Sequence, residues 1–215
     1  MNKASFVSRS LRRFMSPWLA ALAVCVLLAP SAANATPYVV KLKQQGNNVI
    51  ASGDGSIDLT GLTYHNSFSD SGASLWPSDG FINLGSPSSD NLYFGLTGPT
   101  NFGNGDNTGA STSSGDFAAV MGNPLYWGVP GLYVPYGYTS DTALSGSATW
   151  DNATFASLGV TPGTYVWTWG SGADQSFTLD VVAPTAAVPE PAALALFGFG
   201  VLLIGAFVGL RRQVA

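Results

Sequence analysis

Short runs of alternating apolar and polar residues, separated by turn residues, fill the middle of the chain, a pattern typical of β-strands. In PYVVKLK at 37–43, every second residue from Tyr38 to Leu42 is apolar. The run TPGTYVWTWGSGADQSFTLDVV at 161–182 alternates in the same way on both sides of the turn GSGADQ. These patterns predict a half-buried first strand and a late β-hairpin, with Trp167 and Phe177 on the apolar face of the hairpin.

The segment after the first strand predicts two more strands. VIAS at 49–52 has the apolar content of a second strand, and GDG at 53–55 predicts a turn. SIDLTGL at 56–62 predicts a third strand that carries Ile57 and Leu59 on one face.

The stretch from 67 to 115 is rich in Gly, Ser, Thr, Asn and Asp and predicts long loops, with strands only at FINL (81–84) and NLYFGL (91–96). In contrast, DNATFASLG predicts one short helical turn, capped by Asp151 or Asn152 and ended by Gly159. Together the elements predict an all-β fold, an antiparallel β-sandwich or jelly-roll-like domain with one short helix.

The N-terminus has the three parts of a signal peptide. A basic stretch without acidic residues is followed by the apolar run WLAALAVCVLLAP at 18–30, which is too short for a comfortable membrane span. Ala33 and Ala35 then supply the small side chains that a signal peptidase pocket accommodates. The sequence predicts that residues 1–35 are a signal peptide, that signal peptidase cuts after Ala35, and that the domain from residue 36 is exported.

Removal of the signal peptide changes the charge of the protein. Between residues 36 and 183 there are two lysines, eleven aspartates and no arginine, which gives a net charge of −9. A surface of this sign repels phosphate backbones and excludes nucleic acid as a partner. The single cysteine, Cys25, lies in the signal peptide. The exported domain therefore has no disulfide, and its stability must come from a packed core.

The C-terminal segment 184–215 has a separate organisation. Three prolines keep the linker 184–191 extended, so that Glu190 is held out between Pro189 and Pro191. The nineteen uncharged residues 192–210 would form a helix roughly 28 Å long, enough to cross a hydrocarbon core. Arg211 and Arg212 then place the end 211–215 in the cytoplasm.

This tail resembles the PEP-CTERM sorting tail of exported proteins in Gram-negative bacteria that make exopolysaccharide. The matching residues are Val188, Pro189, Glu190 and Pro191, the apolar segment 192–210, and the pair Arg211 and Arg212. The resemblance implies that an exosortase recognises and cuts the chain near the PEP motif, after the helix has anchored it transiently in the membrane. The protein would then be a substrate of the exosortase, delivered to the cell surface or the extracellular matrix, with extracellular polysaccharide as a possible partner.

A second resemblance covers parts of the domain 36–183. The segments GSIDLTGL, GPTNFGNG and SGSATWDNATFASLGVTPGTYVWTWGSGADQSFTLDV resemble those of a group of small PEP-CTERM proteins whose biochemical role is not established. This resemblance supports the boundaries and the fold of the domain and implies no activity.

Residues that could support catalysis or metal binding do not form a recognisable motif. His65 is the only histidine, and no G-x-S-x-G segment exists in the chain. Two of the aspartates could form a glycosidase pair, but spacing alone cannot show it. Asp54, Ser56 and Asp58 have the opening spacing of a calcium loop, yet Leu59 and His65 stand where an EF-hand needs glycine and glutamate. We therefore expect no catalytic residue, no cofactor and no metal.

The aromatic residues suggest an alternative function for the domain. The proline- and glycine-punctuated loop 124–140 could stack rings on sugar faces, as a carbohydrate-binding module does. The candidate residues for this contact are Tyr126, Trp127, Tyr133, Tyr136 and Tyr138. The alternative is that these rings fill the core or hold the loop in place.

Overall fold

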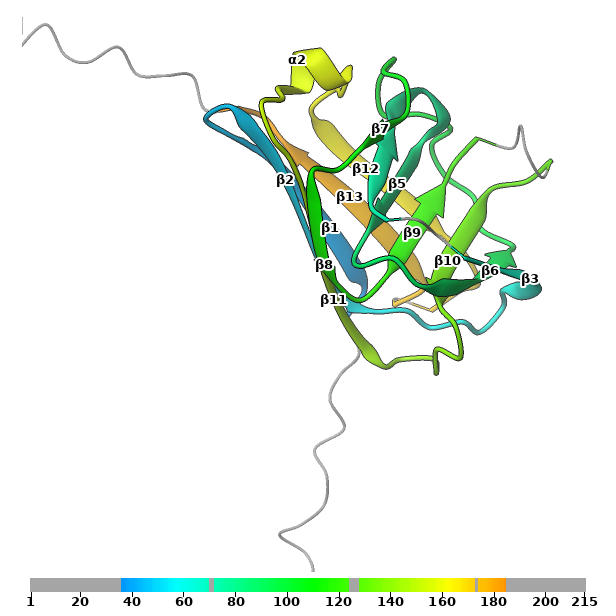
Figure 1. Cartoon of the computed structure of the whole chain (residues 1–215). Coiled ribbons are helices and arrows are strands. Elements are labelled where there is room, and N and C mark those ends of the chain that lie inside the picture. The colour runs from blue at the N-terminus through cyan, green and yellow to red at the C-terminus, as the bar shows by residue number, and fades with distance from the viewer. Residues whose placement is uncertain (1–35, 70–71, 124–127, 173, 185–215) are drawn as a thin grey trace, which may run out of the picture. The chain divides into compact units, whose positions relative to one another are not determined.

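The computed structural model describes residues 36–69, 72–123, 128–172 and 174–184 (Figure 1). The predicted signal peptide 1–35 with Ala33 and Ala35, the sorting tail from residue 185 and the rings of Tyr126 and Trp127 lie outside the described residues. The proposed boundaries between these parts therefore stay predictions.

Two β-sheets form the domain. The six-stranded sheet, here called sheet A, has the order β12 (Gly163–Thr168), β13 (Ser176–Val182), β1 (Tyr38–Gln45), β2 (Asn48–Ser56), β11 (Ala143–Trp150) and β8 (Thr112–Gly115). The seven-stranded sheet B has the order β3 (Thr63–Ser69), β6 (Ser89–Phe94), β10 (Gly131–Pro135), β9 (Ala118–Met121), β5 (Phe81–Leu84), β4 (Ser74–Trp76) and β7 (Thr108–Gly109). Among the ladders within these sheets, only that of β1 with β13 is parallel. A 3₁₀ turn (η2, Pro77–Asp79) and the short helix α2 (Phe155–Leu158) complete the described elements.

The core lies between the inner faces of the two sheets. On sheet A, Tyr38, Val40 and Leu42 of β1 are fully buried, as their alternation predicts. On sheet B, Ile82 and Leu132 belong to the same buried cluster. Each buried aliphatic side chain of this core contributes about 1.5–3 kcal/mol when it is removed from water. The predicted β-sandwich with one short helix is confirmed.

The late hairpin is the most accurate prediction. β12 and β13 pair antiparallel, and Trp167 lies directly opposite Phe177. The ring centroids of these two residues are 6.1 Å apart in an edge arrangement, and the Trp167 indole N–H donates to the carbonyl of Pro99 at 2.9 Å. The hydrogen bond satisfies the polar end of a fully buried ring.

The predicted turn at GDG is wrong, because Gly53, Asp54 and Gly55 all lie inside β2. Gly53 is paired with Val40, and the Tyr38 ring lies where a side chain on Gly53 would be. The glycine is therefore required by packing within a strand and not by a change of chain direction.

The predicted third strand at 56–62 is wrong as well. β2 ends at Ser56, and the following residues form a loop in which the Leu62 N–H donates to the Leu59 carbonyl at 3.0 Å. Ile57 is fully buried and Leu59 packs against the core, so their apolar character reflects burial without a strand.

The stretch 67–115 contains more strands than its composition predicts. FINL and NLYFGL do form β5 and most of β6. However, β3, β4, β7 and β8 also contain residues of this stretch. β3 is polar and irregular, with a shift of register between Tyr64 and Asn66, and β8 has the sequence TSSG. Neither strand has the alternation that signals a buried face.

Helix α2 ends as predicted but begins differently. Gly159 adopts a left-handed conformation (φ 64°) at the C-cap, as predicted. The N-cap is Thr154 and not Asp151 or Asn152: its hydroxyl accepts from the Ser157 N–H, and the Ser157 hydroxyl accepts from the Thr154 N–H. This reciprocal capping box satisfies two donors of a single-turn helix.

Candidate functional site

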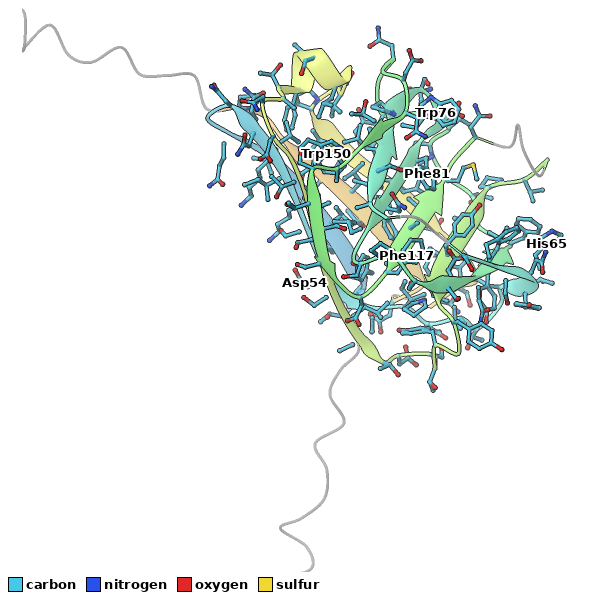
Figure 2. All side chains as sticks on the ribbon, in the orientation of Figure 1. Asp54, His65, Trp76, Phe81, Phe117 and Trp150 are labelled. Carbon is cyan, nitrogen blue, oxygen red and sulfur yellow. The ribbon has the colours of Figure 1, made fainter. Side chains whose placement is uncertain are left out.

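The outer face of sheet B, which points away from sheet A, carries aromatic side chains. Cross-strand pairing places Trp76 opposite Phe81 and Tyr133 opposite Leu92 on this face. The Tyr133 ring lies 6.4 Å from Phe81, edge to face, and 6.5 Å from Phe68. We call Phe68, Phe81 and Tyr133 the outer aromatic cluster. Figure 2 labels Trp76 and Phe81 on this sheet, and Trp150 among the side chains between the sheets.

A cleft of about 590 Å³ adjoins this face where the chain crosses from sheet B to sheet A. The crossing runs from β7 to β8, and two hydrogen bonds fix it: Ala110 N–H to the Ala73 carbonyl (2.8 Å) and Ser111 N–H to the Thr149 carbonyl (2.7 Å). Phe81 from β5 lines the cleft, so the cleft shares a ring with the outer aromatic cluster. Pro87, from the turn between β5 and β6, contributes a second apolar wall.

The predicted sugar-contact residues separate in the structure. Tyr133 belongs to the outer aromatic cluster, whereas Tyr136 follows β10 and is 69% exposed. Tyr138 is half-buried and packs against the core. Its hydroxyl accepts from the Ile57 N–H at 2.9 Å and donates to the Thr142 carbonyl at 2.6 Å, and burial raises its pKa. The structure thus gives Tyr138 the alternative role, that of holding a loop.

Asp58 also has a structural role. Its Oδ1 accepts from the Thr60 N–H (2.9 Å) and the Ser140 hydroxyl (3.0 Å), and its Oδ2 accepts from the Gln175 side chain (3.1 Å). The hydrogen bond from the Thr60 backbone, together with those from side chains, lowers the pKa of the Asp58 carboxyl below its usual value. We call Asp58, Ser140 and Gln175 the loop network, because they join the loops after β2, β10 and β12.

The three residues with calcium-loop spacing do not converge on one point. Asp54 lies on β2 opposite Ser145, and the Ser56 hydroxyl donates to the Thr36 carbonyl at 3.3 Å. Asp58 belongs to the loop network. Within the part of the chain that the structure describes, no three His, Cys, Asp or Glu side chains are grouped as a metal site.

His65 lies on β3 at the register shift and is exposed, with its ring 4.5 Å from that of Phe94. The carboxylate of Asp79, which is buried, accepts a hydrogen bond from the Asn123 side-chain amide at 2.9 Å.

Sequence reasoning missed Phe68, Phe81 and the polar residues of the cleft. Phe68 and Phe81 belong to segments that are distant in sequence from Tyr133, and only the strand order β3–β6–β10–β9–β5 brings them together. A signal was present in FINL, where Phe81 and Asn83 alternate with the buried Ile82 and Leu84 and so share the opposite face.

The fold and these sites define a two-sheet β-domain, and a recognisable motif follows this domain in the sequence. Residues 187–213 match the family model of the PEP-CTERM protein-sorting motif. The chain therefore carries a PEP-CTERM sorting motif, which implies export, transient anchoring in the membrane and processing by an exosortase. Curated proteins and solved structures give no match to it. Among the described residues, no helix is both long enough and apolar enough to span a membrane, and the predicted span 192–210 lies outside them.

Proposed function

We propose that this protein is a non-enzymatic component of the cell surface or extracellular matrix of a Gram-negative bacterium, associated with exopolysaccharide and released from the membrane by an exosortase. The match of residues 187–213 to the sorting motif carries this proposal. Signal peptidase removes residues 1–35, the segment 192–210 holds the chain in the membrane, and the exosortase cuts near Pro189 to Pro191.

The charge of the domain supports a role outside the cell that is independent of nucleic acid and of anionic lipid. Lys41 and Lys43 are the only basic residues between 36 and 183, against eleven aspartates. A strongly acidic domain stays soluble and does not adsorb to anionic headgroups, so that once the helix is removed nothing retains it at the bilayer.

The test is mass spectrometry of both termini of the protein recovered from its host, with and without the exosortase. We expect the mature chain to begin at Thr36 and to lack residues 192–215 only where the exosortase is present. Glu190→Ala should leave the tail uncut, and Thr185→Ala in the same linker is the matched control that should be processed normally. An intact tail in cells with a working exosortase would falsify the proposal.

A second candidate function is carbohydrate binding by the loop 124–140. The position of Tyr133 beside Phe68 and Phe81 on an outer sheet face favours it, since clustered rings of this kind stack on sugars. On a glycan array, Trp127→Ala or Tyr136→Ala should abolish binding if this loop is the contact. Equal binding by both variants and the original protein would exclude the loop.

A further inference from the structure

The cleft beside β7 is lined by uncharged hydrogen-bonding groups. Ser74 comes from β4, Asn107 precedes β7, and Ser113 lies in β8. The side chains of these three residues form no hydrogen bond with another described residue. Ser111, which also lines the cleft, differs because its hydroxyl accepts from the Asp151 N–H at 3.0 Å. As far as the described residues go, the cleft therefore offers the hydroxyls of Ser74 and Ser113 and the side-chain amide of Asn107 for hydrogen bonds to a ligand.

Apolar surface is present on the same walls. The Phe81 ring and Pro87 line the cleft, and Phe81 contacts Tyr133 on the outer face of sheet B. A sugar ring has this dual chemistry, with hydroxyls at its edge and a C–H face that packs on an aromatic ring. The volume of about 590 Å³ lies within the range of small-molecule sites, which hold about 300–1,000 Å³.

The charge around the cleft selects among possible sugars. None of the residues that line it is charged, and the domain around it is strongly acidic. An anionic ligand would find no basic partner in the cleft and would be repelled by the negative field of the domain. The affinity for a neutral ligand would be weakened little by this field.

We propose that the cleft between β4, β7 and β8 binds a neutral polysaccharide segment, with one sugar ring on Phe81 and its hydroxyls bonded to Ser74, Asn107 and Ser113. The inference rests on the proposed association with exopolysaccharide and gives it a site and a ligand class. It places the primary contact at this cleft, apart from the loop 124–140.

The test is calorimetric titration of the processed protein, purified from its host, with neutral hexasaccharides of β-1,4-glucose, β-1,4-mannose, α-1,4-glucose and β-1,4-N-acetylglucosamine. We expect at least one to bind with a Kd on the order of 1 mM or tighter, and a hexauronate to bind at least about tenfold more weakly. If none binds at about 10 mM, or if the hexauronate binds best, the proposal is wrong.

Gly109 provides the decisive variant. It borders the cleft, and an added side chain there meets no atom within 4 Å, so Gly109→Leu should narrow the cleft while the fold is kept. We expect a loss of affinity of about tenfold or more, and a similar loss for Phe81→Ala but not for Phe81→Tyr. Ser145→Leu, at an exposed position on the opposite sheet, is the matched control. If Gly109→Leu binds the neutral hexasaccharide with unchanged affinity, the cleft is not the binding site.

Failure of the site and failure of the proposed function give different results. Retention of the released protein in the host matrix is measured separately, by fractionation of cells that produce the original protein or Gly109→Leu. Glycan binding without matrix retention would leave the site in place and contradict the matrix role. Matrix retention that is equal in the original protein and Gly109→Leu, with no binding of neutral glycans, would support the matrix role and contradict the site.

Discussion

The outer faces of the two sheets differ although their inner faces are alike. One cross-strand row on sheet A runs through Asp180, Lys41, Ser52, Ser147 and Ser114. The corresponding row on sheet B runs through Trp76, Phe81, Met121, Gly131 and Phe94. Both rows belong to the same sandwich, so the need for a core explains neither of them.

The two outer faces differ in burial as well as in composition, since Lys41, Ser52 and Ser114 on sheet A are exposed whereas Trp76, Phe81 and Phe94 on sheet B are half-buried. Polar outer residues such as Ser147 interact with water and with each other, which is the usual state of the solvent face of an antiparallel sheet. Aromatic outer residues such as Phe81 and Tyr133 are half-buried, because they pack against one another on the same face. The cleft at the β7 edge of sheet B, which Phe81 lines, is the part of this face at which the proposed ligand would bind.

The largest expected effect separates the common core from both outer faces. Trp167 is fully buried between the sheets, while its neighbour Val166 is on the outer face of sheet A and 39% exposed. Trp167→Ala should lower the free energy of unfolding by about 3–5 kcal/mol, because it leaves a cavity and frees the Pro99 carbonyl. Val166→Ala should change it by less than about 0.5 kcal/mol. Urea denaturation of both variants measures the change in the free energy of unfolding. Similar losses for Trp167→Ala and Val166→Ala would mean that the inner face of the hairpin does not contribute more to the core than its outer face does.

The accuracy of the sequence-based predictions follows the same division between core and surface. β1 and the late hairpin were predictable because one face of each is buried, which imposes a period of two on residues such as Val40 and Leu179. β3 and β8 were not, since TYHNSFS and TSSG lie at the edges of the sheets and bury few side chains. Edge strands are specified by backbone pairing with a neighbour, which leaves no pattern in their own side chains.

The candidate site was predictable only in part for a related reason. Tyr133 could be singled out because aromatic residues are dense around it in the sequence. The contact of its ring with Phe81 depends on the register of β9 between β5 and β10, in which Ala119 lies opposite both Asn83 and Tyr133. The cleft depends on the crossing from β7 to β8, whose Gly- and Ser-rich sequence predicted only a loop.

A smaller effect tests whether side-chain pairs on the two outer faces differ in interaction energy as well as in composition. Phe81 and Tyr133 contact each other edge to face on sheet B, and the hydroxyls of Ser114 and Ser147 are 2.9 Å apart on sheet A. Double-mutant cycles to alanine should give a coupling of about 0.5–1.5 kcal/mol for the aromatic pair and below about 0.5 kcal/mol for the exposed serine pair. Chemical denaturation of each single and double variant provides the measurement. Equal coupling energies for the two pairs would show that the outer faces differ in residue composition but not in the strength of their side-chain interactions.

The smallest expected effect concerns the loop network, which belongs to neither outer face. Asp58→Asn keeps the shape of the side chain but removes the charge that the Thr60, Ser140 and Gln175 donors stabilise. For this half-buried, solvent-screened group we expect a loss of about 0.5 kcal/mol in the free energy of unfolding at neutral pH. Because the folded pKa of Asp58 is lowered, its contribution is fully present above the ordinary aspartate pKa of about 3.9 and is lost as the pH falls through the lower folded value. The stability difference between the original protein and Asp58→Asn should therefore shrink below about pH 4. A difference for Asp58→Asn that is the same at pH 3 and pH 7, by thermal denaturation, would mean that these hydrogen bonds do not distinguish the charged carboxylate from the neutral acid.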